Sequence, residues 1–170
     1  MNWDAIGAVS EMFAALGVVA SLLYLAIQIR RSDQTARAES LQALWNGARD
    51  RSFAASYTDP EVADLLASGL SDFDSLDSSE KRRFFWLFAE HCFQAQQAMD
   101  LHNSKLISDT DYHAWIYYTA TLMQTPGGKL IWGYLSNTLT PNIQNVMNEF
   151  IAAHPDTPSF IDLNPFFKKD

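Results

Sequence analysis

Acidic and imidazole side chains, the types that bind metals or move protons, gather in the middle of the chain as Glu90-His91 and then His102, Asp111 and His113. A helical metal site needs a carboxylate and an imidazole one turn apart, as in Glu-x-x-His, on facing helices. Adjacent residues such as Glu90 and His91 diverge by about 100° around a helix, and Asp111 and His113 also point apart. The spacing therefore predicts no metal site and no bound cofactor.

The other reactive side chains form no recognisable catalytic set. The single cysteine, Cys92, lies in the apolar stretch 84–93, where we expect a buried, inert thiol. The sequence lacks a Gly-x-Ser-x-Gly elbow, a P-loop and a Gly-x-Gly-x-x-Gly motif. Pro126-Gly127-Gly128-Lys129 resembles a phosphate-binding loop only in composition. We predict no catalytic residue, and we expect Glu90 to be at least half-buried and bonded to a tyrosine or tryptophan.

Composition points to a chain with an unusually apolar segment. Apolar residues make up 48% of the 170 residues and charged residues only 19%, whereas soluble domains carry about 25% charge. The formal net charge of -8 argues against nucleic acid as a partner.

Residues 5–29 supply that segment, because they contain one charged residue, Glu11, and eleven Val, Ile, Leu or Phe residues. As a helix the segment would be roughly 37 Å long, enough to cross a hydrocarbon core about 30 Å thick. The apolar residues contribute roughly -0.3 to -0.6 kcal/mol each and outweigh one carboxylate costing at most about 3 kcal/mol. We predict a transmembrane helix; the alternative is a buried core helix of a soluble protein.

The flanking charges predict the orientation of this helix. Residues 1–4 carry an acid rather than lysine or arginine, and no small-residue cleavage site follows, so a secretory signal peptide fits poorly. Arg30, Arg31 and Arg37 come directly after the helix. By the positive-inside rule we expect a single-pass protein with its N-terminus outside and its C-terminal domain in the cytoplasm.

Small and polar residues of this helix recur at spacings of three and four, which makes a heptad seam: Gly7, Ser10, Ala14, Gly17, Ser21, Tyr24 and Gln28. Helices associate in lipid through close packing of small residues and interhelical hydrogen bonds. Glu11 lies beside the seam and should face a partner helix or a polar cavity, because a carboxylate is costly against lipid. We hypothesise homo-oligomerisation through the seam; the alternative is that small residues are simply common in membrane helices.

The rest of the chain reads as all-α. Ala38, Leu41, Leu44, Trp45 and Ala48 continue the helical period, so the first helix is expected to run through Arg30-Arg31 and to end near Tyr57. Capping signals predict further helix starts at Asp59-Pro60, Asp77 with Glu80, Ser108 with Asp111, Thr125-Pro126 and Thr140-Pro141. We predict a transmembrane helix over 1–31, an all-helical cytoplasmic domain over 32–155 and an extended, proline-rich tail over 156–170.

The N-terminal stretch resembles the opening of a group of uncharacterised bacterial single-span membrane proteins. The matching positions are Ile6-Gly7, Glu11, Ser21-Leu22, Tyr24-Leu25-Ala26 and Gln28-Ile29-Arg30, and the later Pro126-Gly127-Gly128 with Trp132 is also similar. The resemblance implies a protein of the bacterial inner membrane with a helical domain. It carries over no catalytic residue.

Three functions remain open at this point. The leading one is a membrane-anchored, non-enzymatic scaffold or accessory subunit that self-associates or binds a membrane complex through the seam. The second is a homo-oligomeric, ion-conducting pore with a ring of Glu11 carboxylates. The third is a helical enzyme or apolar-ligand-binding protein with an aromatic pocket formed among Phe84, Trp86, Phe93, Trp115, Tyr117 and Trp132.

Overall fold

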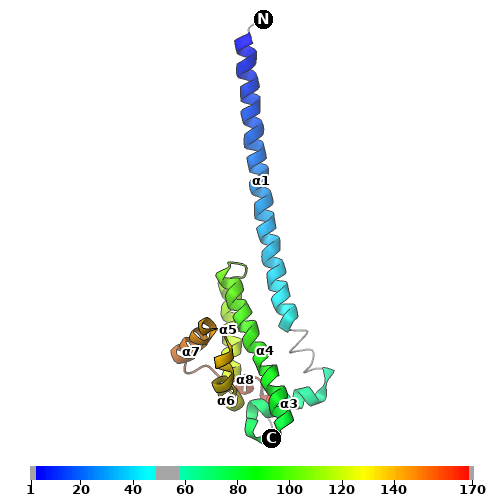
Figure 1. The fold of residues 1–170 in the computed structure, drawn as a ribbon, viewed down its shortest axis with the longest axis vertical. Coiled ribbons are helices and arrows are strands. Elements are labelled where there is room, and N and C mark those ends of the chain that lie inside the picture. Colours follow the sequence, from blue (N-terminus) through cyan, green and yellow to red (C-terminus); the bar gives the residue numbers. More distant parts are fainter. Residues whose placement is uncertain (1–2, 49–57, 169–170) are drawn as a thin grey trace. The chain divides into compact units, whose positions relative to one another are not determined.

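A computed structural model of the chain describes residues 3–48 and 58–168, with side chains from residue 11 onward in the first range. The described residues form seven α-helices and no strand, which confirms the all-α prediction (Figure 1). The helices are α1 (Trp3–Ala48), α3 (Pro60–Ser71), α4 (Ser78–Asn103), α5 (Asp109–Met123), α6 (Pro126–Leu135), α7 (Pro141–Ala153) and α8 (Phe160–Leu163). Three 3-10 turns accompany them: η2 (Phe73–Ser75), η3 (Ser136–Thr138) and η4 (Pro165–Phe167).

Helix α1 runs without a break through Arg30-Arg31, as the sequence predicted. Its predicted end near Tyr57 lies outside the described residues. The chain forms two compact units, Met1–Glu39 and Ser40–Asp170, so the division falls inside α1 and beyond residue 31, where the sequence analysis placed the boundary. The last turns of α1 therefore belong to the helical domain.

The helix starts in the domain follow the capping residues of the sequence, because a side-chain oxygen there accepts a backbone N–H left unpaired by the first turn. Asp77 accepts the N–H groups of Ser79 and Glu80, and the Glu80 carboxylate accepts the Asp77 N–H at 2.8 Å, which completes a capping box. All five predicted N-caps are confirmed in position: Asp59, Asp77, Ser108, Thr125 and Thr140.

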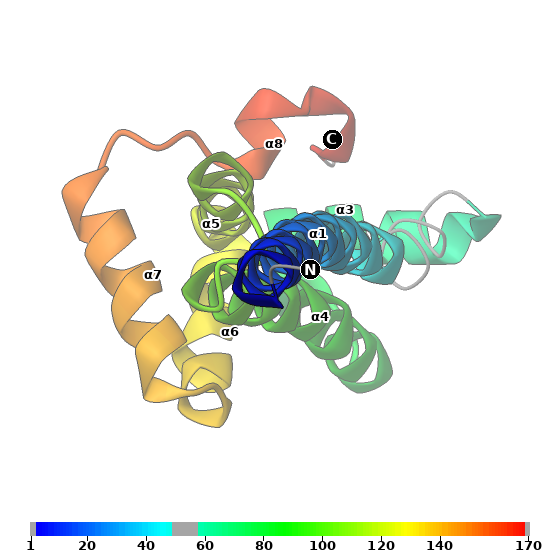
Figure 2. The same ribbon diagram turned by 90° about the horizontal axis from the view of Figure 1, so that it is seen from above.

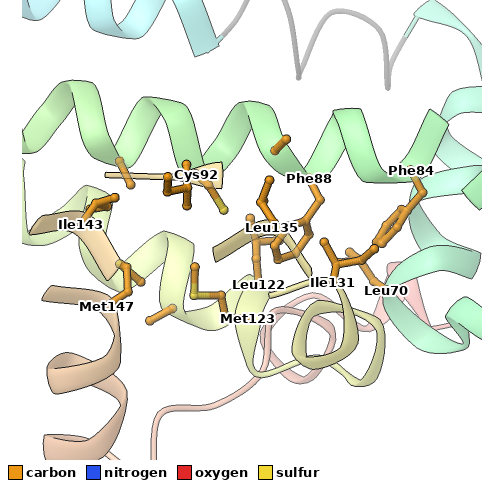
Figure 3. Packing of buried hydrophobic residues seen from close by; sticks show 14 of the residues in the cluster. Leu70, Phe84, Phe88, Cys92, Leu122, Met123, Ile131, Leu135, Ile143 and Met147 are labelled. Atoms are coloured by element: carbon orange, nitrogen blue, oxygen red, sulfur yellow. The ribbon is translucent and has the colours of Figure 1, made fainter. Parts of the chain in front are cut away.

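The main core of the domain lies between α4 and the helices packed against it (Figure 3). Gly69 of α3 and Gly127 of α6 permit a close backbone approach there, since a Cβ at Gly127 would collide with the Gly69 carbonyl oxygen. The largest fully buried apolar side chains of this main core come from the five helices α3 to α7 (Figure 2): Leu70, Phe84, Phe88, Ile116, Leu122, Ile131, Leu135, Ile143 and Met147.

A second, smaller cluster receives the end of α1. Leu44 and Ala48, each 0% exposed, pack with Ala98, Ile107 and Trp115 from the α4–α5 region. This explains why the helical period of the sequence continues past Arg37 as a one-sided apolar stripe. Leu41, Leu44 and Ala48 pack within the domain, and the Trp45 ring centre lies 5.0 Å from that of Trp115.

The C-terminal tail, predicted to be extended, is instead partly helical. Ser159 and Asp162 form a capping box that starts the single turn α8, and η4 follows. The segment also packs back, since the Phe160 ring lies 6.0 Å from the Tyr118 ring and the Phe167 carbonyl accepts a hydrogen bond from Ser71 Oγ at 3.2 Å. The proline content favoured an extended chain, but the local capping box and the partial burial of Phe160 and Phe167 outweigh it.

Candidate functional site

The first unit exposes its apolar side chains along the whole described length. Every side chain from residue 11 to residue 35 is exposed, including Phe13 at 65% and Leu22 at 61%. Within the described residues, Glu11–Ala48 is the one helix segment long and apolar enough to cross a membrane, with a mean hydropathy of 2.1 over its most apolar window. None of that window is buried, whereas the core helix of a soluble protein would be mostly covered.

The seam predicted on α1 is a continuous exposed surface over its described part. Gly7 and Ser10 lie on α1 but outside the residues whose side chains are described, whereas Glu11 and the later seam positions are all exposed. A Cβ added at Gly17 would meet nothing within 4 Å, so the backbone there is open to close approach.

Two hydrogen bonds within the helix link neighbouring seam residues. Ser21 Oγ donates to the Gly17 carbonyl at 2.8 Å, and Gln28 Nε2 donates to Tyr24 Oη at 2.9 Å. These bonds satisfy part of the polar groups of the seam locally, which lowers the cost of placing them in lipid. The structure thus joins the seam residues in pairs on one helix face.

The pair Glu90-His91 separates into a half-buried acid and a buried imidazole. Glu90 is half-buried, as expected. His91 is 5% exposed, and its Nδ1 lies 3.5 Å from Tyr118 Oη. Burial lowers the pKa of His91 to about 4 and raises the pKa of Tyr118. The imidazole is therefore neutral at neutral pH and serves the packing of α4 on α5.

Cys92 has the inert character expected of it. The thiol is 1% exposed within the main core, and burial raises its pKa. A nucleophilic cysteine needs the opposite environment, with an accessible and stabilised thiolate.

The histidines and acids near the start of α5 form helix-end contacts rather than a ligand set. His102 Nε2 lies 2.7 Å from Asp109 Oδ1, and the Tyr112 ring stacks on His102 at 4.4 Å. His113 Nδ1 lies 2.7 Å from the Asp109 carbonyl, and Asp111 accepts from Ser108 Oγ. Nowhere in the described ranges do three His, Cys, Asp or Glu side chains gather as metal ligands would.

The aromatic residues considered for one pocket lie in different places. Phe84 is 0% exposed in the main core, and Trp115 belongs to the second cluster with Leu44. Trp132 Nε1 donates to Asn148 Oδ1 at 3.1 Å beside a groove between α6 and α7. Helical period identifies the face on which each residue lies, but not the helix that it meets.

Trp86 lines a groove of about 240 Å³ that sequence reasoning missed. The groove lies where η2, α4 and α6 meet, and the signal that could have revealed it is the run Lys81-Arg82-Arg83 one turn before Trp86. We call it the α4–α6 groove, and its lining residues are Phe73, Lys81, Arg82, Phe85, Trp86, Ile131 and Tyr134.

Comparisons with protein-family models, with curated proteins and with solved structures find no match for this chain. The resemblance of residues 2–32 to bacterial single-span membrane proteins therefore stays a prediction, and the exposed helix and the helical domain are the features that bear on function.

Proposed function

We propose that the protein is a membrane-anchored, non-enzymatic scaffold or accessory subunit. In this proposal α1 crosses the bilayer, and its seam binds the same helix of a second copy or a helix of a larger membrane complex. The observation that carries the proposal is that every apolar side chain between residues 12 and 29 is exposed. No residue of the described chain covers them, and a lipid bilayer is the solvent in which such a surface is stable.

The seam supports association rather than simple anchoring. In lipid, apolar burial does not drive helices together, so contact depends on small residues that let backbones approach. The open backbone at Gly17 and the locally bonded Ser21 give such a surface. Glu11, exposed beside the seam, would be sheltered from lipid by a partner helix.

The proposed location is the inner (plasma) membrane of a bacterium, with the N-terminus outside and the domain in the cytoplasm. Arg30, Arg31 and Arg37, all exposed on α1, support this orientation. Protease protection of tags on each end of the full chain in right-side-out membrane vesicles tests it. We expect cleavage of the N-terminal tag alone. Cleavage of the C-terminal tag alone would show the opposite orientation.

A crosslinking experiment in detergent micelles tests the association. Gly17→Leu fills the seam and should lower the crosslinked dimer fraction about tenfold. Val19→Leu is the matched control, because Val19 lies about 200° further round the helix. A strictly monomeric protein that also purifies from native membranes without a partner would reject the proposal.

A further inference from the structure

The α4–α6 groove combines a buried apolar floor with exposed aromatic walls. Ile131 is 1% exposed and lies in the main core beside Leu70 (Figure 3). Trp86 and Tyr134 are 62% and 69% exposed, and the Phe85 ring meets the Trp86 ring edge-on at 5.4 Å. Trp, Tyr and Arg are the residue types that carry most binding energy at protein interfaces, and all three line this groove.

The charged groups that line the groove are both cations, Lys81 and Arg82. Lys81 Nζ lies 5.3 Å from the Phe73 ring centre and donates to the Asp74 carbonyl at 3.3 Å, which holds it at the rim. The neighbouring carboxylates of Asp77 and Glu80 form the capping box of α4, and the pKa of Asp77 is lowered by the backbone N–H of Glu80 and also by the positive charge of Arg82. Neither carboxylate is among the lining residues, so the lining itself presents positive charge on a chain whose net charge is -8.

The size of the groove favours a peptide side chain over a small-molecule ligand. Its volume of about 240 Å³ lies below the roughly 300–1,000 Å³ of ligand pockets. One large apolar side chain can rest on Ile131 between Trp86 and Tyr134, with acidic neighbours beside Lys81 and Arg82. We propose that the groove binds an acidic peptide segment of a partner protein through one apolar anchor residue.

The lining of the groove favours such a peptide over lipid headgroups. A headgroup would use the cations Lys81 and Arg82 but would leave the buried Ile131 side chain and the aromatic walls without an apolar partner. The inference rests on the proposed scaffold function, since it names the chemistry of the segment that such a scaffold would hold.

The test uses the full chain in zwitterionic detergent micelles and a fluorescein-labelled synthetic peptide with a central phenylalanine flanked by glutamates. Fluorescence anisotropy should report saturable binding with a Kd below about 1 mM. Trp86→Ala and the pair Lys81→Gln with Arg82→Gln should each weaken binding about tenfold. Lys129→Gln, in the groove between α6 and α7 that Trp132 and Asn148 line, is the matched control and should leave binding unchanged.

Several outcomes would overturn the inference. They are the absence of an anisotropy change, equal binding of a peptide with lysines in place of the glutamates, or binding unaffected by the groove variants. Binding of phosphatidylglycerol vesicles through the groove, with no binding of the peptide, would assign the surface to lipid instead. Because Gly17→Leu acts on crosslinking and not on the groove, failure of this inference is distinguishable from failure of the scaffold proposal.

Discussion

The two units of the chain place the same residue types in different environments. Phe13 and Gly17 of the first unit are exposed, whereas Phe88 and Gly127 of the second unit are buried in the domain. Thr35 bonds the Arg31 carbonyl on an exposed helix face, and Thr125 makes the same kind of bond inside the domain. The comparison teaches that the domain buries its apolar residues against one another, whereas the described apolar side chains of the first unit remain almost entirely exposed.

The largest expected effect on this comparison comes from a phenylalanine. Phe88→Ala should lower the free energy of unfolding of the domain by about 3–5 kcal/mol, because it empties the middle of the core. Phe13→Ala, the matched change in α1, should leave that free energy unchanged. Urea denaturation of the full chain in micelles, followed by tryptophan fluorescence, measures both; an equal loss in the two variants would break the distinction.

A second prediction concerns acid, and it follows from the depressed pKa of His91. The unfolded chain binds a proton at a pKa of 6.5 and the folded chain only at about 4. The contribution of His91 to the free energy of unfolding is therefore fully present above pH 6.5. It is lost as the pH falls to 4, and the loss is about 3 kcal/mol.

His91→Gln should remove that share of the pH dependence, and Gln97→Ala, at an exposed and non-titrating position of the same helix, should not. The measurement is the difference between each variant and the parent in unfolding free energy at pH 7 and pH 4. Parallel curves for His91→Gln and the parent would contradict the assignment.

The third prediction compares two glycines. Gly127→Ala should lower the free energy of unfolding of the domain by about 1–3 kcal/mol. The new methyl group would collide with the Gly69 carbonyl oxygen and must push α6 away from α3. Gly17→Ala meets nothing and should leave the domain as stable as before. Thermal unfolding monitored by circular dichroism separates the two, and an unchanged midpoint for Gly127→Ala would refute the close approach.

The smallest effect is expected at a threonine. Thr125 is 0% exposed, accepts the Gly128 N–H at 3.0 Å and caps α6. Thr125→Ala should lower the free energy of unfolding of the domain by about 1 kcal/mol, whereas Thr35→Ala should leave that free energy unchanged. Urea midpoints for the two variants check this, and a larger loss at Thr35 would argue that α1 and the domain unfold together.

Local features of the fold were predictable and the pairing of helices was not. Each N-cap, from Asp59 to Thr140, follows from side chains near it in sequence, and the continuity of α1 follows from an unbroken helical period. The capping box of Ser159 and Asp162 is equally local, but the prolines around it favoured the prediction of an extended tail.

The candidate sites show the same limit. The seam on α1 lies on one helix, so spacing alone predicts it. The α4–α6 groove needs Lys81 and Trp86 of one helix to meet Tyr134 of another. A periodic pattern within one helix does not predict that these residues lie together, because their proximity depends on how α6 packs after the turn at Thr125.

The burial of Cys92 has a practical consequence for mapping the surroundings of α1. A chain whose single thiol is enclosed and protonated is nearly silent to maleimide reagents while it stays folded. Cysteines introduced one at a time along α1 would then be the dominant reporters in their variants, without prior removal of the native residue. Their labelling pattern would read out which face of the helix meets lipid, water or another protein.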